Sequence, residues 1–442
     1  IAFGHRRLAI IDLSAAAHQP MCSADKKLWI TYNGEIYNYI ELREELKAKG
    51  YNFSSASDTE VILSAYREWG SNCVDHFNGM WAFVIYDISK NILFGSRDRF
   101  GVKPLYYSIN SSHFAFASEQ KSLLKSGMVK AEMNPAAVFD FFVFSKIEAE
   151  EEGMFKGIYE LMQAHNFEYN IASKELKKWK YYQLQTNTAF EVFDPKKFEQ
   201  FTQETQENII NAIRLRLRAD VAVGSCLSGG MDSSAIVSIM NKLLGNEGKK
   251  LQLFTASFEN EKIDEGKWAK IVVDRTYSEW SRTFPTADGL LQDLEKLTYC
   301  QDIPIWSTST YAQYKVMELA NSKRVKVILD GQGGDELWAG YPHHQTAFMR
   351  ELIGAGHLGA AKTLLKSAGN FPSNIIWFTK QALKHGGLSA FPSATLPQIY
   401  KYYFKHLQLL HPDFFSAYMH RFEKHFDEQP TTLNGMLQNE TT

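Results

Sequence analysis

The stretch that most restricts the fold of this chain is VAVGSCLSGGMDSSAIVSIM, at residues 221–240. An apolar run ends in Ser-Gly-Gly, and an aspartate, two serines and apolar residues at helical spacing follow at once. This order predicts a buried strand that turns through bare backbone into a helix. Short apolar runs at 251–258 and 325–329 alternate with helical patterns, which indicates a parallel α/β sheet.

In such a sheet, ligands collect beyond the carboxyl ends of the strands. The turn Ser228-Gly229-Gly230 presents backbone N–H groups there, and the start of the next helix adds a partial positive charge. This arrangement suits a phosphate or a pyrophosphate. The loop has no Walker lysine, and Asp232 would repel a bare phosphate, so we expect Mg²⁺ between them. The plainer alternative is a glycine turn in which Asp232 only caps the helix.

A second glycine-rich block, DGQGGDELWAGY, follows the strand predicted at 325–329. Three glycines in the four positions 331–334 let a ligand approach the backbone closely. The adjacent carboxylates of Asp335 and Glu336 can hold a cation or an ammonium group. The simpler interpretation is again a glycine-rich loop with a capping aspartate.

The first 185 residues have a different pattern, rich in short strands. Alternating apolar residues flank Asn33-Gly34, and helices are expected at about 39–49 and 58–69. The opening segment IAFGHRRLAIIDLS also reads as strand, and residues 166–184 read as a hairpin. From about residue 195 the apolar residues follow the spacing of a long amphipathic helix instead of the alternation of strands. We therefore place a domain boundary at 188/189. Beyond Tyr341 the pattern is helical.

Composition narrows the classes of function. A formal net charge of -2 over 442 residues gives no global attraction to nucleic acid or to an anionic membrane. No run approaches the length of a membrane span, and no signal peptide is visible. Four scattered cysteines make no disulfide framework and no metal-binding pair, which is typical of a cytoplasmic protein. Cys22 is expected in a loop.

Short strings in both segments of the chain resemble motifs of known families. The string SGGMDSS resembles the pyrophosphate loop of the ATP pyrophosphatases, and together with DGQGGDE it resembles the glutamine-hydrolysing asparagine synthetases. HRRLAIID, YNGEIYN, SDTEVIL and RDRFGVKPLYY occur in the order seen in class II glutamine amidotransferases. The resemblance implies α/β and α+β architecture: an Ntn-hydrolase-like αββα sandwich over 1–188, then a parallel-sheet α/β ATP pyrophosphatase (HUP-like) domain over 189–442.

For the first segment, the resemblance implies a glutamine site. Arg7 would clamp the α-carboxylate and Asp58 would meet the α-ammonium group. Asn33 and Gly34 would form the oxyanion hole, and Glu35 would help orient the substrate. Each motif alone has a simpler interpretation, because Asn33-Gly34 also predicts a type I′ hairpin turn, Asp58 a helix cap and Asp98-Arg99 a surface ion pair.

For the second segment, the resemblance implies adenylation of aspartate. ATP and aspartate would give β-aspartyl-AMP and pyrophosphate, and ammonia released from glutamine and carried through an internal tunnel would displace AMP to form asparagine. The residues implied in ATP binding are Leu227, Ser228, Gly229, Gly230, Asp232, Ser233 and Gly331. Asp232 and Asp335 would bind Mg²⁺, and Gln332 stands where the family usually has a glutamate considered as a base.

Two departures and several rivals accompany the resemblance. The family's nucleophile is an N-terminal cysteine, whereas this chain opens at Ile1, and the family's phosphate-neutralising lysine has no match before Thr442. We therefore expect a piece truncated at both ends. The alternatives are a related amidotransferase or β-lactam synthetase-like enzyme acting on another carboxylate, a non-catalytic paralogue and an RNA-thiolating relative. The expected partners are small molecules, with no nucleic acid and no membrane, and a homodimer is plausible by analogy.

Overall fold

The described part of this chain, in a computed structural model, comprises residues 1–146, 151–185, 191, 193–245, 250–259, 264–367, 411–418 and 420–421. Contacts divide the chain into two compact units. The first contains Ile1–Val129, Ile158–Gln183 and Glu191–Gly331, and the second contains Lys130–Gly157, Leu184–Phe190 and Gln332–Thr442. The boundary predicted at 188/189 lies outside the described residues.

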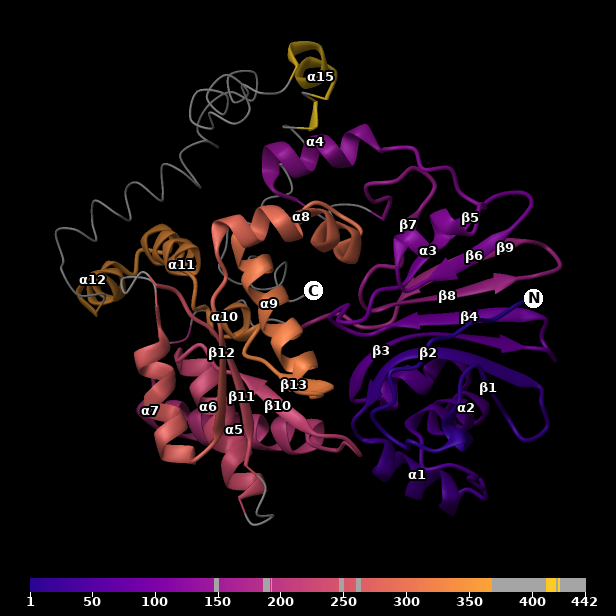
Figure 1. Cartoon of the computed structure of the whole chain (residues 1–442), viewed down its shortest axis with the longest axis horizontal. Helices are drawn as coiled ribbons and strands as arrows, with labels where there is room; N and C mark the ends of the chain where they lie inside the picture. Colours follow the sequence, from indigo (N-terminus) through magenta and orange to yellow (C-terminus); the bar gives the residue numbers. More distant parts are fainter. Residues whose placement is uncertain are drawn as a thin grey trace. The chain divides into compact units, whose positions relative to one another are not determined.

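A six-stranded antiparallel sheet forms the first layer of the amino-terminal region, in the order β1-β2-β3-β4-β8-β9 (Figure 1). Its strands are β1 (Met21–Cys22), β2 (Leu28–Ile36), β3 (Gly79–Asp87), β4 (Ile92–Arg97), β8 (His165–Asn170) and β9 (Glu175–Lys180). The predicted hairpin at 166–184 is confirmed as β8 and β9. Cys22 was predicted in a loop, and this prediction is wrong. It lies in β1 and pairs with Trp29 of β2.

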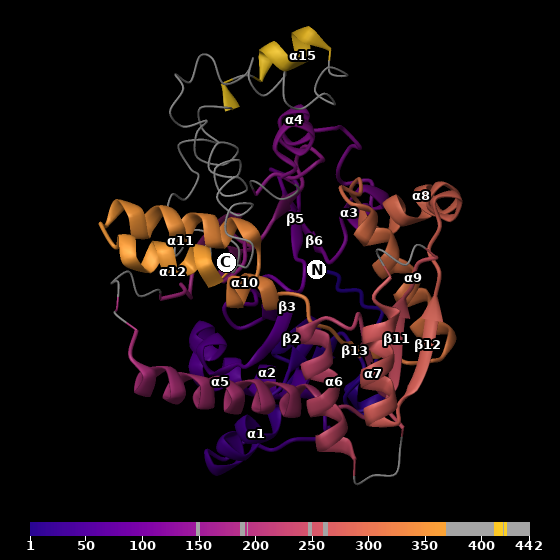
Figure 2. The same ribbon diagram turned by 90° about the vertical axis from the view of Figure 1, so that its left-hand side faces the viewer.

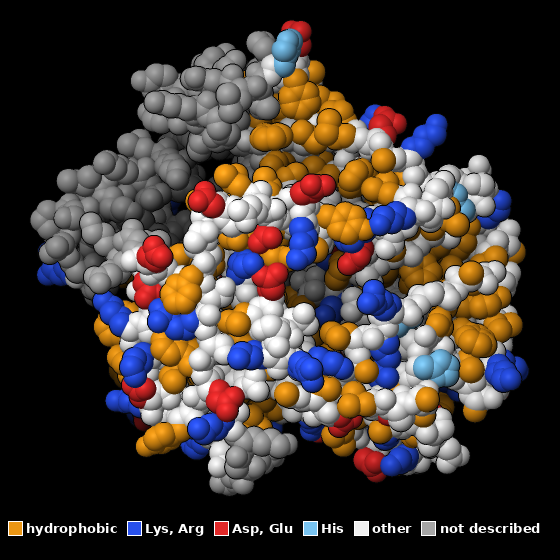
Figure 3. All heavy atoms as spheres, viewed as in Figure 1, with side chains coloured by type: hydrophobic (Ala, Val, Ile, Leu, Met, Phe, Trp, Pro, Cys, Tyr) orange, Lys and Arg blue, Asp and Glu red, His pale blue; other side chains and the backbone are white. Residues whose placement is uncertain are grey.

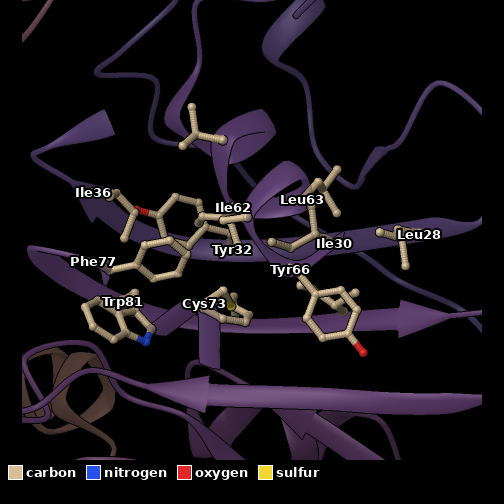
Figure 4. Close-up of a cluster of buried hydrophobic side chains, with 14 of the residues drawn as sticks. Leu28, Ile30, Tyr32, Ile36, Ile62, Leu63, Tyr66, Cys73, Phe77 and Trp81 are labelled. Atoms are coloured by element: carbon tan, nitrogen blue, oxygen red, sulfur yellow. The ribbon is translucent and has the colours of Figure 1, made fainter. Parts of the chain in front are cut away.

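Helices α1 (Tyr39–Ala48) and α2 (Asp58–Trp69) cover one face of this sheet. Alternate residues of β2, among them Ile30 and Tyr32, point to that face and pack against Ile62 and Tyr66 of α2 (Figure 4). Helix α2 begins where the Ser57 hydroxyl accepts a hydrogen bond from the backbone N–H of Thr59. The two helices predicted from apolar spacing are therefore confirmed.

The opposite face of the large sheet packs on a second antiparallel sheet. Its order is β6-β5-β7, with β5 (Tyr106–Ile109), β6 (Phe114–Ala117) and β7 (Tyr159–Glu160). Val84 and Phe167 of the large sheet share a core with Phe114 and Phe116 of β6. Helix α3 (Gln120–Lys125) lies against β5 and β6. The order helix, sheet, sheet, helix is the predicted αββα sandwich.

A four-stranded parallel sheet, in the order β12-β11-β10-β13, forms the middle of the later region (Figure 1). Its strands are β10 (Val223–Cys226), β11 (Gln252–Ala256), β12 (Glu279–Thr283) and β13 (Val327–Leu329). Strand β10 pairs in parallel with both β11 and β13. The parallel α/β sheet predicted from the apolar runs is therefore confirmed.

Helices cover both faces of the parallel sheet. On one face lie α5 (Pro195–Arg216), α6 (Met231–Leu244) and α7 (Gly266–Thr276), which share a core with β10, β11 and β13. Figure 2 shows α6 and α7 side by side. On the other face lies α9 (Thr308–Ser322), whose Val316 and Ala320 pack against the sheet. Helix α8 (Ala287–Gln301) contacts α9.

The second compact unit is helical in its described residues. Its helices are α4 (Pro135–Phe144), α10 (Gly334–Trp338), α11 (Pro342–Gly354), α12 (Leu358–Ser367) and α15 (Pro412–Ala417). Phe139 and Val143 of α4 pack on Phe415 of α15, and the Arg421 guanidinium forms an ion pair with Asp140. Short 3₁₀ helices at Ala15–Ala17 and Gly70–His76 complete the described elements of the chain.

Two further predictions, both on the backbone of the first region, are wrong. Asn33 and Gly34 make no hairpin turn, because β2 runs straight through them and Gly34 lies opposite Trp81 of β3. Glycine is needed there for close approach, since an added Cβ would lie 2.1 Å from the carbonyl oxygen of Met80. The opening segment is not a strand either. Its polar groups bond within the segment and to neighbouring side chains, as for His5 Nδ1 and Thr31 Oγ1 at 3.1 Å.

None of the helices among the described residues combines the length and the apolar character needed to cross a bilayer. On the face drawn in Figure 3, the described Lys and Arg side chains are interspersed with Asp and Glu. That face therefore carries a mixed surface charge.

The core between β2 and α2 yields a stability prediction. Ile62 is fully buried, whereas Ile40 on α1 is 44% exposed. We expect Ile62→Ala to lower the free energy of unfolding by about 2–5 kcal/mol, because it removes buried methyl groups and leaves a cavity. Ile40→Ala is the matched control and should stay within about 0.5 kcal/mol. Chemical denaturation checks both, and equal losses would contradict this assignment of the core.

Candidate active sites

The first candidate site lies at the end of β2. Asn33 and Glu35 lie on the face shared with Thr31, opposite the face that carries Ile30 and Tyr32, because side chains alternate along a strand. Glu35 is buried and Asn33 is half-buried. The side chains of Asn33 and Glu35 therefore lie on one face near the end of β2, where both could contact the same small ligand.

Asp58 lies beneath the same strand end. It is the first residue of α2, and the helix cap is Ser57, so the interpretation of Asp58 as a cap is wrong. Its Oδ2 accepts hydrogen bonds from the Tyr32 hydroxyl and from the backbone N–H of Ile36, both at 3.0 Å. Burial raises the pKa of this carboxyl although those hydrogen bonds oppose the rise. A ligand ammonium group would favour its charged form.

Arg7 is braced on the turn that follows it. Its Nη2 donates to the carbonyl oxygens of Ile11 at 2.6 Å and Asp12 at 2.8 Å. Within the described residues, Nη1 and Nε of Arg7 make no hydrogen bond. A guanidinium held on one side keeps donors in a fixed fork for a carboxylate, which suits the role predicted for Arg7.

Asp12 connects Arg7 to the loop before Asp58, a role that the sequence did not reveal. Its φ of 55° is left-handed, a conformation that aspartate tolerates better than most residues. Its carboxylate accepts hydrogen bonds from Ser14 and from the backbone N–H of Ala56 at 2.7 Å. Burial opposes the charge, but these hydrogen bonds lower the pKa of Asp12 below its ordinary value. The two predicted headgroup ligands therefore share one anchor.

The Asp98-Arg99 pair also differs from its simpler interpretation as a surface ion pair. Asp98 is buried, and its carboxylate accepts from the backbone N–H groups of Trp81, Val102 and Lys103. Arg99 donates to the carbonyl oxygens of Val74 and Phe77 instead. Asp98 therefore shapes the loop that carries Lys103.

Buried charges gather around Glu35. Burial, followed by the nearby charge of Asp58, raises the pKa of Glu35 to about 7, and Lys103 and Arg216 oppose that rise. Burial also lowers the pKa of Lys103. Lys103 was missed because its quoted motif gave no reason to place it beside Glu35. A carboxyl that titrates near neutral pH at a strand end is typical of a functional site.

Cys73 offers no replacement for the expected nucleophile. All four cysteines are free, and Cys22 lies in β1. Cys73 is fully buried, and burial raises the pKa of its thiol. A buried neutral thiol is unreactive.

The second candidate site lies at the carboxyl end of β10. Gly229 has a φ of 93°, and a Cβ there would lie 2.6 Å from the backbone nitrogen of Ala269 in α7. Ser228 Oγ and Ser233 Oγ are 3.0 Å apart, and the backbone N–H of Gly230 donates to Ser228 Oγ at 3.1 Å. The loop is thus held in one shape by its own hydroxyls, directly at the start of α6.

Asp232 stands in the first turn of α6, and the helix cap is Gly230, so the capping interpretation of Asp232 is wrong. Within the described residues its carboxylate has no hydrogen-bond or ion-pair partner. A Cβ added to Gly331, beyond β13, would lie 3.2 Å from the Cβ of Asp232. The parallel pairing of β10 with β13 therefore brings Gly331 close to the start of α6.

Two residues, Leu227 and Asp330, lie next to these loops, and only Leu227 was singled out from the sequence. Leu227 is buried, its backbone N–H donates to Phe254 and its carbonyl accepts from the Thr255 hydroxyl, so its predicted contact with adenosine stays a prediction. Asp330 accepts from Gln313 Nε2 at 2.9 Å and from the backbone N–H of Gly331 at 2.7 Å. Asp330 therefore fixes the entry to the second loop.

Gln332 and Asp335 are exposed residues of the second compact unit. Asp335 lies in the first turn of α10, and the adjacent Glu336 accepts a hydrogen bond from the Tyr341 hydroxyl at 3.0 Å. The unit boundary falls between Gly331 and Gln332, so binding of one ion by Asp232 and Asp335 stays a prediction.

The described residues contain no cluster of three or more His, Cys, Asp or Glu side chains that could hold a metal ion. Mg²⁺ at nucleotide sites is usually bound by one or two carboxylates together with substrate phosphates. A lone carboxylate beside a phosphate loop, as for Asp232, fits that kind of site.

Comparisons with known proteins identify the families that the two regions of this chain resemble. Residues 1–182 match the family model described as glutamine amidotransferase domain, and residues 204–384 match the one described as asparagine synthase. "Putative asparagine synthetase (glutamine-hydrolyzing) 2" of Methanocaldococcus jannaschii is 36% identical over 369 residues, which cover 80% of this chain and 69% of that protein.

Two further relatives are longer than this chain. "Asparagine synthetase (glutamine-hydrolyzing) 3" of Bacillus subtilis is 33% identical over 365 residues, covering 78% of this chain and 57% of that protein. "Amidase chyE" of Penicillium rubens is 28% identical over 364 residues, covering 80% of this chain and 52% of that protein. The chain thus spans little more than half the length of these two.

The raised pKa of Glu35 predicts a pH-dependent stability. The folded value is about 7 and the ordinary value is 4.5, so the folded protein binds this proton more tightly than the unfolded chain does. Stability is therefore lost as pH rises from the lower value to the higher one, and the loss is complete above it. We expect Glu35→Gln to raise the free energy of unfolding by about 3 kcal/mol at pH 8 but by only about 1 kcal/mol at pH 5.

Denaturant titrations at the two pH values measure this difference. Glu44→Gln, at an exposed position of α1, is the control and should change little at either pH. An equal effect of Glu35→Gln at both pH values would contradict the raised pKa.

Proposed function

Because this chain belongs to the glutamine-hydrolysing asparagine synthetase family, we propose that it serves the ATP-dependent synthesis of asparagine from aspartate, with ammonia taken from glutamine. The observation that carries the proposal is the contact between the loop at 228–233 and Gly331 at the carboxyl edge of one parallel sheet. That edge is where nucleotides bind in sheets of this kind.

The first step is adenylation. An oxygen of the aspartate β-carboxylate attacks the α-phosphorus of ATP, the bond from that phosphorus to the oxygen bridging to the β-phosphorus breaks, and pyrophosphate leaves. The N–H groups of Gly229 and Gly230 and the start of α6 would hold the departing pyrophosphate. Ser228 and Ser233 already bond to each other, so their hydroxyls are in place to turn towards it.

Magnesium is part of this proposal. Asp232 would hold the ion on the phosphates, and the ion would supply positive charge where pyrophosphate leaves. The absence of a partner for Asp232 within the described residues supports this role.

The second step forms the amide. The nitrogen of ammonia attacks the activated carbonyl carbon, the bond to the AMP oxygen breaks, and a proton leaves the nitrogen. Gln332 cannot take that proton at neutral pH, but its side chain can hydrogen-bond the intermediate. Glu336 is the carboxylate that we propose in place of a base at 332, and its contact with Tyr341 fixes its direction.

The glutamine site supplies the ammonia. Arg7 would bind the α-carboxylate, Asp58 would meet the α-ammonium group, and Glu35 would orient the substrate. Asn33 and Gly34 would donate to the oxyanion. The shared anchoring of Arg7 and the Asp58 loop by Asp12 supports a site for one amino-acid headgroup.

A second candidate function is the same chemistry on a different carboxylate. Gln332 favours it, because this side chain departs from the family's usual glutamate at a position that we propose to act in the second step. Dependence of pyrophosphate release on aspartate separates the two functions.

Compartment and assembly complete the proposal. The four cysteines are all free, which suits a reducing compartment, and we place the reaction in the cytoplasm. A homodimer stays a prediction by analogy with the family.

The phosphate loop gives a direct test of function. With ATP, Mg²⁺, aspartate and ammonium, we expect aspartate-dependent release of pyrophosphate and AMP. Asp232→Asn should lower this rate about 10- to 100-fold, because it removes a charged contact to the ion. Asp274→Asn, on the exposed face of α7, is the matched control and should leave the rate unchanged. Release that does not need aspartate would contradict the choice of substrate.

The position of Gln332 gives a second test. Gln332→Ala should slow amide formation about 2- to 10-fold, because it removes one hydrogen bond to the intermediate. Gln332→Glu should be tolerated, since glutamate is the family's usual residue. Asparagine formation with ammonium as nitrogen source measures both rates, and no change in either variant would place Gln332 outside the site.

A further inference from the structure

The turn between α5 and β10 makes a reciprocal contact with the segment that carries Arg7. The backbone N–H of Asp220 donates to the carbonyl oxygen of Ile10 at 2.9 Å, and the backbone N–H of Asp12 donates to Asp220 Oδ2 at 2.7 Å. These partners are 208 positions apart in the chain. The contact therefore joins the amidotransferase region to the residues that lead into the phosphate loop.

Asp12 connects this contact to the residues of the proposed glutamine site. Its carbonyl holds Arg7, and its carboxylate holds Ser14 and the backbone of Ala56. Its N–H is held by Asp220. Asp220 is thus the partner that comes from outside the amidotransferase region, and it fixes the turn on which the Arg7 guanidinium rests.

The same turn reaches the other end of the glutamine site. Arg218 donates to the carbonyl oxygen of Tyr37 at 2.7 Å and to the Glu41 carboxylate at 2.6 Å. Arg216 lies over the Tyr37 ring, 4.6 Å from its centroid. Tyr37 follows Glu35 by two residues, so the turn holds both the Arg7 segment and the end of β2.

We infer that Asp220 is a positioning residue for glutamine: by holding the Asp12 turn, it keeps the Arg7 guanidinium and the loop before Asp58 aimed at one amino-acid headgroup. Capture of glutamine then depends on the turn that leads into β10 and the phosphate loop. The inference rests on the proposed function only in taking glutamine as the bound amino acid.

A second contact between the same two regions of the chain provides a control for a purely structural role of Asp220. Lys121 of α3 bonds to Asp302 at the end of α8 at 2.9 Å, and so joins the same two regions of the chain away from the Arg7 segment. If Asp220 only holds the regions together, Lys121→Ala should weaken glutamine binding as Asp220→Ala does. If Asp220 positions Arg7, only the Asp220 variant should do so.

Calorimetric titration of the full chain with L-glutamine, and separately with MgATP, tests the inference. We expect Asp220→Ala to raise the glutamine Kd about 3- to 10-fold, as for one lost hydrogen bond near a charge. Its Kd for MgATP should not change. Asp220→Asn should restore most of the affinity, because its amide oxygen can accept the same N–H. Lys121→Ala should match the parent chain with both ligands.

The possible failures are distinct. No glutamine binding by the parent chain would refute the proposed glutamine site, and the inference with it. Normal glutamine affinity in Asp220→Ala, or an equal loss in Lys121→Ala, would overturn the inference alone. If Asp220→Ala does not fold, Asp220→Glu replaces it, because the added methylene moves the carboxylate away from the Asp12 N–H, and the same results are expected.

Discussion

Parallel pairing of β10 with β13 is the constraint on which the synthetase site depends. Because both strands end at the same edge, the turn after β10 and the turn after β13 meet although about a hundred residues separate them. The contact is so close that Gly331 has little room for a side chain next to Asp232. Glycine at 331 is therefore a consequence of the sheet, whereas Gly229 is required by its positive φ and by the close approach of α7.

The amidotransferase site is built on a different principle. Its opening segment joins no sheet, so side chains satisfy its backbone groups: Arg7 takes two carbonyls, and Asp220 takes one N–H. Such a segment has no ladder to fix its position, and its geometry depends on a few hydrogen bonds to distant residues. Ligand-binding side chains on it are accordingly more sensitive to their anchors than those on β2.

The sequence predicted the features that arise from local pattern. The spacing of apolar residues marked α2 and the strands, and the order of strand, glycine turn and helix marked the loop at 228–233. It failed where the cause is non-local. Gly34 carries a hairpin signal, yet glycine is there because β3 approaches closely. Asp12, Lys103 and Asp330 carry no motif signal, since their roles depend on partners brought close only by the fold.

The charges around Glu35 show how stability and binding oppose each other here. Burial raises the pKa of the Glu35 and Asp58 carboxyls, and repulsion by the charge of Asp58 raises the pKa of Glu35 further. Lys103 and Arg216 offset only part of this repulsion. An α-ammonium group bound beside these carboxyls would favour their charged forms, so binding would offset part of the cost of burying them. Arg216 belongs to the helix that leads to the Asp220 turn, so the second region contributes to this balance as well as to the position of Arg7.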